Sequence, residues 1–584
     1  MSKKTYDFSA LLKIFHYAKS YRFILILVTI SAILSSLFSV ARPYFLQFAI
    51  DKGIFVKDYE KLIYYGSMML MVLFFEVISQ ILFVYYSGWL GEHVIANIRT
   101  QLFEKIVHFR MQYFDKSSVG TLVTRTVNDI QKISEIFSQG LFMIISDVLK
   151  MIVITVFMFS KHWQLSLLVF SIFPLTMGAT KWFHKKVKDT FEKVRNEVAN
   201  LNTFVQEHIS GMKVVQNFAS EDIEFKKFNT INQRHRDAWL KTILYYSIFF
   251  PITEILNSIT LGLLVWYGGL QSVENSGLSI GIVITFIQLT QMLFKPLRQI
   301  ADKFNTLQMG MVAAKRVFEV LDTPNTLIEN TSKELTKVQG NIKFTDVEFS
   351  YIEGEKVLDK ISFEAKKGET IAIVGATGAG KSTIVKLLNR FYDIDKGKIE
   401  IDNTDIYQVS LKNLREHISV VLQDVFLFAD SILNNIRIND TSISREQVIK
   451  AAKEIGVHQF IMSLPDNYDY NVKERGAILS SGQRQLISFL RSYLANPSIL
   501  VLDEATSSID SNTEQLIQKA TEKITKNRTS IIIAHRLATI QNADRILVME
   551  KGKIVETGKH EELIQHRNGF YKRLYDAQFG ESGK

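Results

Sequence analysis

A glycine-rich stretch in the second half of the chain constrains its fold more than any other feature. It reads Gly375-Ala376-Thr377-Gly378-Ala379-Gly380-Lys381-Ser382-Thr383 and matches the pattern G-x-x-x-x-G-K-[ST] in full. An apolar, β-branched run, Thr370–Val374, precedes it, and a run suited to a helix, Ile384–Leu388, follows it. A strand, a glycine loop and a helix in this order predict a phosphate-binding loop, because loop N–H groups and a helix N-terminus together attract anions.

Two side chains of this loop are expected to contact a nucleotide directly. Lys381 would reach the β- and γ-phosphates, and Ser382 would bind Mg²⁺. The alternative is a glycine-rich turn with a chance lysine, and the strand and helix on either side argue against it. The remaining positions are expected to surround the phosphates: Gly375, Ala376, Thr377, Gly378, Ala379, Gly380 and Thr383.

An aromatic and an amide residue end two other apolar runs. Tyr351 closes the strand-like run Ile342–Tyr351, and its ring is expected to stack on adenine, although alone it would count only as a strand aromatic. Gln423 follows the run Ile418–Leu422, where its amide would reach Mg²⁺ and the attacking water. Both residues are therefore candidates for the nucleotide site.

Two buried-strand patterns end in residues suited to hydrolysis. Asp503 and Glu504 follow the run Ile499–Leu502, and active sites of open α/β sheets lie at this end of the strands. Asp503 is expected to hold the Mg²⁺ shell, and Glu504 to polarise water for attack on the γ-phosphate. His535 follows the run Ser530–Ala534. A lone histidine is more often structural, but this position makes His535 a candidate for contact with the γ-phosphate.

The composition points to a membrane rather than to nucleic acid. The chain has 584 residues, of which 47% are hydrophobic, a formal net charge of +10 and no cysteine. Without cysteine it has no disulfides, thiolate metal sites or cysteine nucleophiles. A basic excess can indicate nucleic-acid binding, but lysine-rich cytoplasmic loops of a membrane protein explain it better, because the long apolar windows all lie in the first half. No nucleic-acid partner is expected.

Six apolar windows in the first half each approach the length that crosses a bilayer. A polar segment with an apolar stripe, Ser2–Ser20, precedes them and is typical of a helix lying on the membrane surface. The connections after the second and fourth windows are long and rich in Lys and Arg, so the positive-inside rule places them and both termini in the cytoplasm. The windows are Phe23–Leu46, Leu62–Tyr86, Ile136–Ser160, Trp163–Thr180, Ile243–Tyr267 and Leu278–Phe294.

The two long connections do not have the composition of loops. Apolar and charged residues alternate in them at helical spacing, with few Gly or Pro. They predict membrane helices that continue into the cytosol, with breaks at Phe114–Gly120 and at Ser210-Gly211. Short helices at these breaks are expected to contact the soluble, nucleotide-binding part of the protein.

A few ionisable residues fall inside the windows, where lipid disfavours charge. For Glu76 and Glu254, contact with a substrate and internal pairing remain equally open. Asp147 and Lys150 lie three residues apart, so pairing with each other is the preferred interpretation. The cavity is expected to be aromatic and apolar, with a lining of Phe45, Phe83, Phe142, Phe249, Phe250 and Phe286.

The stretch Leu479-Ser480-Ser481-Gly482-Gln483 makes a family resemblance specific. The second half of the chain resembles the nucleotide-binding domain of ABC transporters, and the windows ahead of it resemble an ABC exporter half-transporter. The implied fold is a multi-pass α-helical membrane domain, with six transmembrane helices and long cytosolic extensions, fused to an α/β P-loop domain. The implied domains are 1–322, a linker at 323–338, and 339–584. The matching motifs, in family order, are Gly375–Thr383, Gln423, Leu479–Gln483, Asp503-Glu504, Ser508-Ile509-Asp510 and His535.

The resemblance implies ATP-driven export of hydrophobic or amphipathic drugs or lipids across the cytoplasmic membrane. In that family two nucleotide domains meet head to tail, and each ATP, with Mg²⁺, lies between one subunit's phosphate loop and the other's signature. A second half-transporter and membrane lipid are the implied partners. A soluble DNA-repair or translation ATPase, an importer and an ATP-gated channel are disfavoured by the six windows, the fused ATPase and the intact Glu504 respectively. The implied nucleotide contacts include Asp510 and the signature residues Ser480, Ser481, Gly482 and Gln483.

One position departs from the family pattern. The usual signature is Leu-Ser-Gly-Gly-Gln, and Ser481 stands where the first glycine is expected. A weakened signature beside an intact Glu504 resembles one subunit of a heterodimeric exporter that has one hydrolytic and one degenerate site. The alternative is a serine tolerated in a homodimer, such as a lipid flippase-like exporter.

Overall fold

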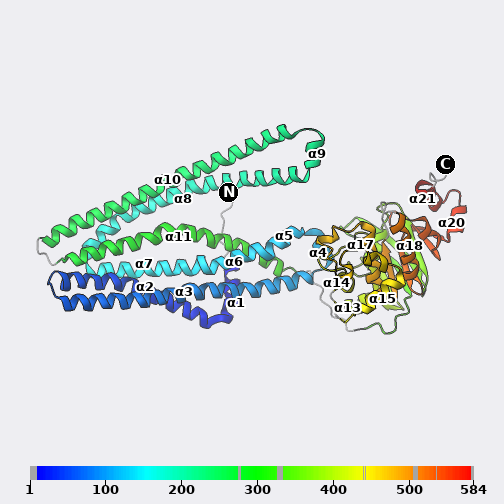
Figure 1. Cartoon of the computed structure of the whole chain (residues 1–584), viewed down its shortest axis with the longest axis horizontal. Coiled ribbons are helices and arrows are strands. Elements are labelled where there is room, and N and C mark those ends of the chain that lie inside the picture. The colour runs from blue at the N-terminus through cyan, green and yellow to red at the C-terminus, as the bar shows by residue number, and fades with distance from the viewer. Residues whose placement is uncertain are drawn as a thin grey trace. The chain divides into compact units, whose positions relative to one another are not determined.

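The computed structural model describes residues 9–273, 278–324, 333–438, 440, 442–503, 511–534 and 536–579 (Figure 1). The chain divides into two compact units, and a short segment of the first half of the sequence belongs to the second unit. The helical unit contains the described residues up to His108 and from Ser117 to Pro324. The α/β unit contains Phe109–Lys116 and the described residues that follow Pro324.

Long helices make up the helical unit. Five of its described helical segments are long and apolar enough to cross a membrane: Ser9–Ile54, Tyr59–Val107, Val119–Lys161, Trp163–Ser210 and Glu221–Val273. The sixth predicted window corresponds to a shorter apolar stretch, Ile280–Pro296. The elements are α1 (Ser9–Ala18), α2 (Arg22–Phe48), a π-helical turn (Ala49–Ile54), α3 (Tyr59–Val107), α5 (Val119–Thr124), α6 (Ile130–Glu135), α7 (Phe142–Lys161), α8 (Trp163–Ser210), α9 (Met212–Asn217), α10 (Glu221–Val273) and α11 (Ile280–Leu321).

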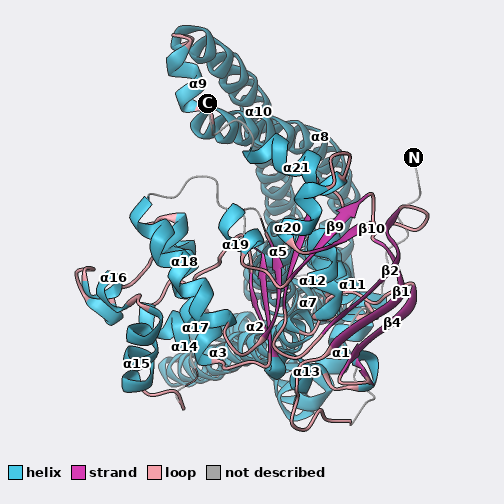
Figure 2. Cartoon of the chain, turned by 90° about the vertical axis from the view of Figure 1, so that its right-hand side faces the viewer, coloured by secondary structure: helices cyan, strands magenta, loops and turns pink. Residues whose placement is uncertain are grey.

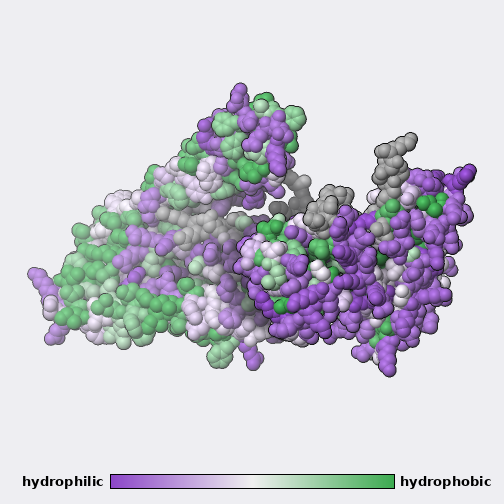
Figure 3. Space-filling view, turned by 45° about the vertical axis from the view of Figure 1, so that its right-hand side comes forward, coloured by the Kyte–Doolittle hydropathy of each residue, from purple (hydrophilic) through white to green (hydrophobic). Residues whose placement is uncertain are grey.

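The surface of the helical unit is apolar, as expected for contact with lipid. Large hydrophobic side chains are exposed on its helices, among them Phe74 on α3 and Trp266 on α10, which are 61% and 65% exposed. Figure 3 shows hydrophobic residues gathered on this unit and hydrophilic residues on the α/β unit. A soluble protein rarely exposes so much continuous apolar surface. The multi-pass membrane domain predicted from the windows is therefore confirmed.

The predicted helical extensions are present, and their breaks lie close to the predicted positions. α8 ends at Ser210, and α9 begins at Met212, directly after the predicted break. In the other connection α3 already ends at Val107, and a short helix, α4 (Met111–Lys116), lies across the first half of the predicted break.

One predicted ion pair is wrong. Asp147 on α7 pairs with Lys303 on α11 rather than with Lys150 on its own helix. The packing of α11 beside α7 brings a lysine from 156 residues away to the carboxylate. Sequence spacing on one helix cannot reveal such a partner.

Two sheets form the framework of the α/β unit (Figure 2). The first is antiparallel, with strand order β2-β1-β4-β5, and the second has the order β10-β9-β3-β8-β7-β6. In the second sheet all neighbours from β9 to β6 are parallel, and only β10 is antiparallel. The strands are β1 (Ile342–Ser350), β2 (Lys356–Ala365), β3 (Thr370–Gly375), β4 (Lys396–Ile401), β5 (Thr404–Asp405), β6 (Ile418–Val421), β7 (Ile499–Asp503), β8 (Thr529–Ile533), β9 (Arg545–Glu550) and β10 (Lys553–Gly558).

The central sheet is buried on both faces, which explains why its strands read as continuous apolar runs. On β7, Leu500 and Leu502 face one core, and Ile499 and Val501 face the other. The first core is completed by α14, α15, α17 and α18, and the second by α12 and the antiparallel sheet. The helices are α12 (Lys381–Leu388), α13 (Leu411–His417), α14 (Ile432–Arg437), α15 (Arg445–Ile455), α16 (His458–Met462), α17 (Ser481–Leu494), α18 (Ser511–Thr525), α19 (Leu537–Gln541), α20 (His560–Gln565) and α21 (Phe570–Phe579).

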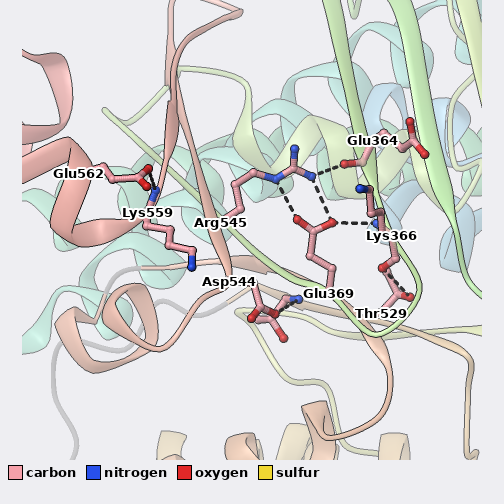
Figure 4. Close-up of polar contacts among 9 residues, drawn as sticks. Glu364, Lys366, Glu369, Thr529, Asp544, Arg545, Lys559 and Glu562 are labelled. Atoms are coloured by element: carbon pink, nitrogen blue, oxygen red, sulfur yellow. Dashed lines mark hydrogen bonds and ion pairs between the residues drawn. The ribbon is translucent and has the colours of Figure 1, made fainter.

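The edge of the sheet where β3 and β9 begin is closed by polar contacts (Figure 4). Glu369, just before β3, forms an ion pair with Arg545 at 2.9 Å and accepts a bond from the Lys366 N–H. Asp544 accepts a hydrogen bond from the Thr370 N–H at 2.8 Å. These contacts hold the starts of two neighbouring strands together. The predicted phosphate loop comes after the end of β3, so it lies at the opposite edge of the sheet.

Candidate nucleotide-binding site

The glycine-rich loop has the curled form that a phosphate group requires. β3 ends at Gly375 and α12 begins at Lys381, as the sequence predicts. Gly380, the residue that caps α12, has a φ of 98°, a left-handed conformation that residues with a side chain rarely adopt. A Cβ there would also lie 2.7 Å from Leu358 Cδ2 and 3.1 Å from the Val357 carbonyl oxygen. Only glycine therefore allows this close approach.

Lys381 supplies a buried cation inside the loop. The residue is only 7% exposed, and its Nζ donates hydrogen bonds to the carbonyl oxygens of Gly375 at 2.8 Å and Ala376 at 3.0 Å. Burial lowers the pKa of this ammonium group, and the nearby Asp503 carboxylate acts in the opposite direction. An ammonium group has three donors, so the lysine can bond an anion in addition to these carbonyls. The curled backbone, the cation and the start of α12 together fit a phosphate group.

The next two residues of α12 have different environments. Ser382 is half-buried, and Thr383 is buried. The hydroxyl groups of Thr383 and Tyr351 lie 3.2 Å apart, so the tyrosine that follows β1 lies beside the phosphate loop. The Tyr351 and Phe349 rings pack edge to face, with their centroids 4.8 Å apart. Stacking of Tyr351 on adenine stays a prediction.

Strand register brings the other predicted residues to the same edge of the sheet. Asp503 is the last residue of β7, only 9% exposed, and pairs with Ile533 of β8, which itself pairs with Ile373 of β3. Gln423 is exposed and lies two residues beyond the end of β6. Hydroxyl, carboxylate and amide oxygens are the ligands that Mg²⁺ prefers, so the donor set of Ser382, Gln423 and Asp503 fits this ion.

Three predicted site residues lie outside the described residues: Glu504, Asp510 and His535. Glu504 directly follows Asp503 in the sequence, and His535 follows the described Ala534. Their predicted contacts with the γ-phosphate and with ATP remain predictions.

The signature residues form the first turn of α17. Ser480 caps this helix: its hydroxyl accepts a bond from the Gln483 N–H at 3.2 Å, and the Gln483 side chain accepts one from the Ser480 N–H at 2.9 Å. Ser481 is the exposed first residue of the helix, and Gly482 is buried. Ser481 is not among the residues with positive φ, so the backbone itself does not require glycine at this position.

The short helix α4 packs within the α/β unit although it comes from the first half of the chain (Figure 1). Asp115 accepts a hydrogen bond from the Tyr392 hydroxyl, and Arg110 forms an ion pair with Asp393. The sequence predicted contacts near Asp115, but neither Tyr392 nor Asp393 was singled out. An aromatic and an acidic residue in a loop after α12 match no motif, so no local signal could have identified them.

The fold and this site define a class: a multi-pass membrane protein that carries a P-loop nucleotide-binding unit in the same chain. The family model for the ABC transporter transmembrane region matches residues 25–297, and the model for the ABC transporter matches residues 358–507. The chain belongs to the ABC transporter family. It is a half-transporter of the exporter type, in which ATP hydrolysis is coupled to transport.

Relatives of similar length support this assignment. The ABC transporter ATP-binding protein YknV of Bacillus subtilis (strain 168) is 35% identical over 99% of this chain and 96% of its own length. The ATP-dependent lipid A-core flippase of Syntrophus aciditrophicus (strain SB) is 36% identical over 85% of this chain and 82% of its own. The probable multidrug resistance ABC transporter protein YheH of B. subtilis is 35% identical over 88% of this chain and 76% of its own.

Proposed function

We propose that this chain exports hydrophobic or amphipathic molecules, drugs or lipids, from the cytoplasmic membrane as one half of a dimer. The observation that carries the substrate class is a cavity of about 570 Å³ within the helical unit, between α8, α10 and α11. Ligand sites for small molecules have volumes of about 300–1,000 Å³. The family membership supports the coupling of this transport to ATP, and the names of the lipid flippase and the multidrug relatives support the class of substrate.

The lining of this cavity is amphipathic. Phe183 and Phe249 stack at a centroid distance of 3.9 Å and form part of an aromatic wall. Glu254 and Asn257 lie on α10 in the same cavity, and the Asn257 side chain is only 8% exposed. An apolar wall and a few polar groups suit a molecule that has both kinds of surface. The full lining is Thr180, Phe183, His184, Tyr246, Phe249, Phe250, Glu254, Asn257, Gln291, Phe294 and Lys295.

The sequence identified only part of this lining. Phe249 and Phe250 belong to it, as predicted, but Phe286 is fully buried in a core of the helical unit. Phe45, Phe83 and Phe142 do not line this particular cavity, and a role for them in contact with substrate stays a prediction. A phenylalanine on a membrane helix has the same sequence pattern whether it faces lipid, a core or a cavity, so the sequence alone could not assign Phe286 to the core.

For hydrolysis, we assign roles to the residues at the carboxyl edge of the sheet. Lys381 holds the β- and γ-phosphates, Tyr351 contacts the base, and Glu504 removes a proton from the attacking water. Mg²⁺ would neutralise phosphate charge when bound by Ser382, Gln423 and Asp503. His535 contacts the γ-phosphate. The contacts from the opposing subunit come from Ser480, Ser481, Gly482, Gln483 and Asp510.

The orientation follows from charge. The connections that contain α4 and α9 are rich in Lys and Arg, and the positive-inside rule places such segments in the cytoplasm. Both termini and the α/β unit then lie in the cytoplasm, where ATP is available.

We propose a heterodimer in which the Ser481 signature serves a degenerate site. Ser481 presents an exposed side chain at the start of α17, where the γ-phosphate of the opposing site would approach. Glu504 remains to support hydrolysis at the other site. The second candidate is a homodimeric, flippase-like exporter, and the ordinary helical backbone at Ser481 favours it because serine fits there without strain.

A vesicle experiment tests both the exporter function and the heterodimer. The chain is reconstituted alone, and together with the half-transporter that copurifies with it from its host, and ATP-dependent movement of a fluorescent lipid and a hydrophobic dye is recorded with its direction. We expect export only by the paired complex. Export by the chain alone would support the homodimer, and import or ATP-independent flux would contradict the exporter function.

A further inference from the structure

Three aromatic rings pack together beside the phosphate loop. Tyr351 and Tyr392 meet edge to face at a centroid distance of 5.2 Å, and Phe349 contacts both rings. The Lys386 ammonium group lies 5.2 Å from the Tyr351 ring and 5.8 Å from the Tyr392 ring. Lys386 belongs to α12, the helix that begins with the phosphate loop. The Tyr351 ring therefore contacts α12 through Lys386 as well as through Thr383.

Tyr392 also connects this cluster to α4. Its ring is only 8% exposed, and its hydroxyl donates a hydrogen bond to the Asp115 carboxylate. The Tyr351 hydroxyl, at the other end of the cluster, lies 3.2 Å from the Thr383 hydroxyl. Packed contacts thus run without a gap from Asp115 on α4, through the two tyrosines, to Thr383 on α12.

A cleft of about 230 Å³ lies beside these contacts. Gln112 of α4 and Tyr351 both line it, together with Tyr392. Residues of α4 and of the nucleotide site therefore line the same cleft. A shift of α4 would move Tyr392, and Tyr392 contacts Tyr351. α4 follows the membrane helix α3 in the sequence, after His108–Arg110.

We propose that Tyr392 is a positioning residue that couples α4 to nucleotide binding in the same chain. When α4 is seated, the bond from Tyr392 to Asp115 holds the Tyr392 ring, and that ring holds Tyr351 in the orientation that contacts the base. The inference rests on the proposed role of Tyr351 in binding the base.

Two changes separate this role from simple packing. Tyr392→Phe keeps the buried ring and removes only the hydroxyl, and Asp115→Ala removes the acceptor. Tyr407→Phe is the control, because Tyr407 is a half-buried tyrosine of the α/β unit whose hydroxyl accepts a bond from a backbone N–H, that of Ile394. A merely structural hydroxyl would give the same result in both tyrosines.

The assembled transporter in lipid is assayed for ATPase activity over a range of ATP and GTP concentrations. For Tyr392→Phe and Asp115→Ala we expect KM for ATP to rise about three- to tenfold, the range that corresponds to one ordinary hydrogen bond, with kcat at saturating ATP unchanged. The KM for GTP should change less, because the base contact is what is lost. Tyr407→Phe should leave both KM values as they are.

A double-mutant cycle with Tyr351→Ala decides the route. If Tyr392 acts through Tyr351, Tyr392→Phe has no further effect on KM in the Tyr351→Ala background. An effect that persists there, or a wild-type KM in Tyr392→Phe, overturns the inference while the proposed base contact stands. A wild-type KM in Tyr351→Ala itself overturns both the base contact and the inference.

Discussion

Single residues in this protein derive their properties from the backbone groups around them. Lys381 lies buried among loop carbonyl oxygens, an arrangement that holds a cation where phosphate oxygens are expected. Asp402 is instead an anion that backbone N–H groups surround. Its carboxylate accepts hydrogen bonds from the N–H groups of Gln339, Gly340 and Asn341, at 2.7, 3.2 and 2.9 Å, and so holds the start of the antiparallel sheet.

Replacing Lys381 by alanine should remove the cation that faces the phosphates. A charge-assisted hydrogen bond contributes about 1.5–3 kcal/mol, so we expect ATP to bind about ten- to a hundredfold more weakly to Lys381→Ala. Equilibrium titration with a fluorescent ATP analogue measures the effect. Lys367→Ala, which removes an exposed lysine before β3, is the control and should bind as the wild type does. Equal affinities for the two variants would remove the phosphate-loop assignment.

Replacing Asp402 by asparagine should make stability depend less on pH. Partial burial raises the pKa of Asp402, but hydrogen bonds from Asn341 and Gly340 outweigh it and the pKa lies below the ordinary value of 3.8. The carboxylate therefore stabilises the fold above that value, and the stabilisation is lost as the pH falls through the lowered pKa. We expect the Tm of Asp402→Asn to be about 2–4 °C below wild type at pH 7, with the difference shrinking as the pH falls below 3.8 and vanishing once the pH is below the lowered pKa of the folded state. A difference that stays constant with pH would contradict this assignment.

The starts of several helices in the α/β unit are set by local residues, either by a capping box or by a glycine in a left-handed conformation. Ser480 and Gln483 form a complete capping box at the start of α17, and Ser444 and Gln447 form another at the start of α15. α12 differs, because its cap is a left-handed glycine. The phosphate loop thus leaves the first N–H groups of α12 without a capping side chain, which suits a helix end that binds an anion.

Gly380→Ala should distort this loop for two reasons, a strained φ and a collision with Leu358 and the Val357 carbonyl. The control is Gly354→Ala, since Gly354 has a φ of 91° but no neighbouring atom within 4 Å of an added Cβ. Both changes should destabilise the unit by about 1 kcal/mol through backbone strain. Only Gly380→Ala should also lose ATP binding. Normal ATP affinity in that variant would show that the loop has room for a side chain.

At the scale of the whole molecule, the open question is how two half-transporters divide the work of hydrolysis. The proposed heterodimer predicts that one chain supplies the competent base and the other does not. Glu504→Gln in this chain alone separates this arrangement from a complex with two competent sites, because it would stop nearly all hydrolysis in the first case and leave the partner's site active in the second.

Glu504→Gln in this chain alone should reduce the ATPase rate of the complex by a factor of about 10²–10⁴, the usual contribution of a general base, with ATP binding largely intact. Steady-state hydrolysis and ATP titration of the purified complex measure the two properties. Glu522→Gln on α18 is the control, because its exposed side chain lies on a helix and should not affect the rate. Ser481→Gly should raise hydrolysis little if its site lacks a base. A strong gain from Ser481→Gly, or half the rate left in Glu504→Gln, would favour two equivalent sites.

The class of fold and the phosphate loop could be predicted from residues that are neighbours in the sequence. The glycine pattern requires a loop between a strand and a helix, the apolar windows require a membrane domain, and the signature forms its own helix cap; each depends on residues that are neighbours in the chain. Other contacts are seen only in the folded chain: Asp147 pairs with Lys303, Phe286 belongs to a core whereas Phe249 lines a cavity, and Tyr392 joins Asp115 to Tyr351. The physical reason is that such contacts join residues far apart in the sequence, and the packing of whole helices and sheets selects the partner that each side chain meets.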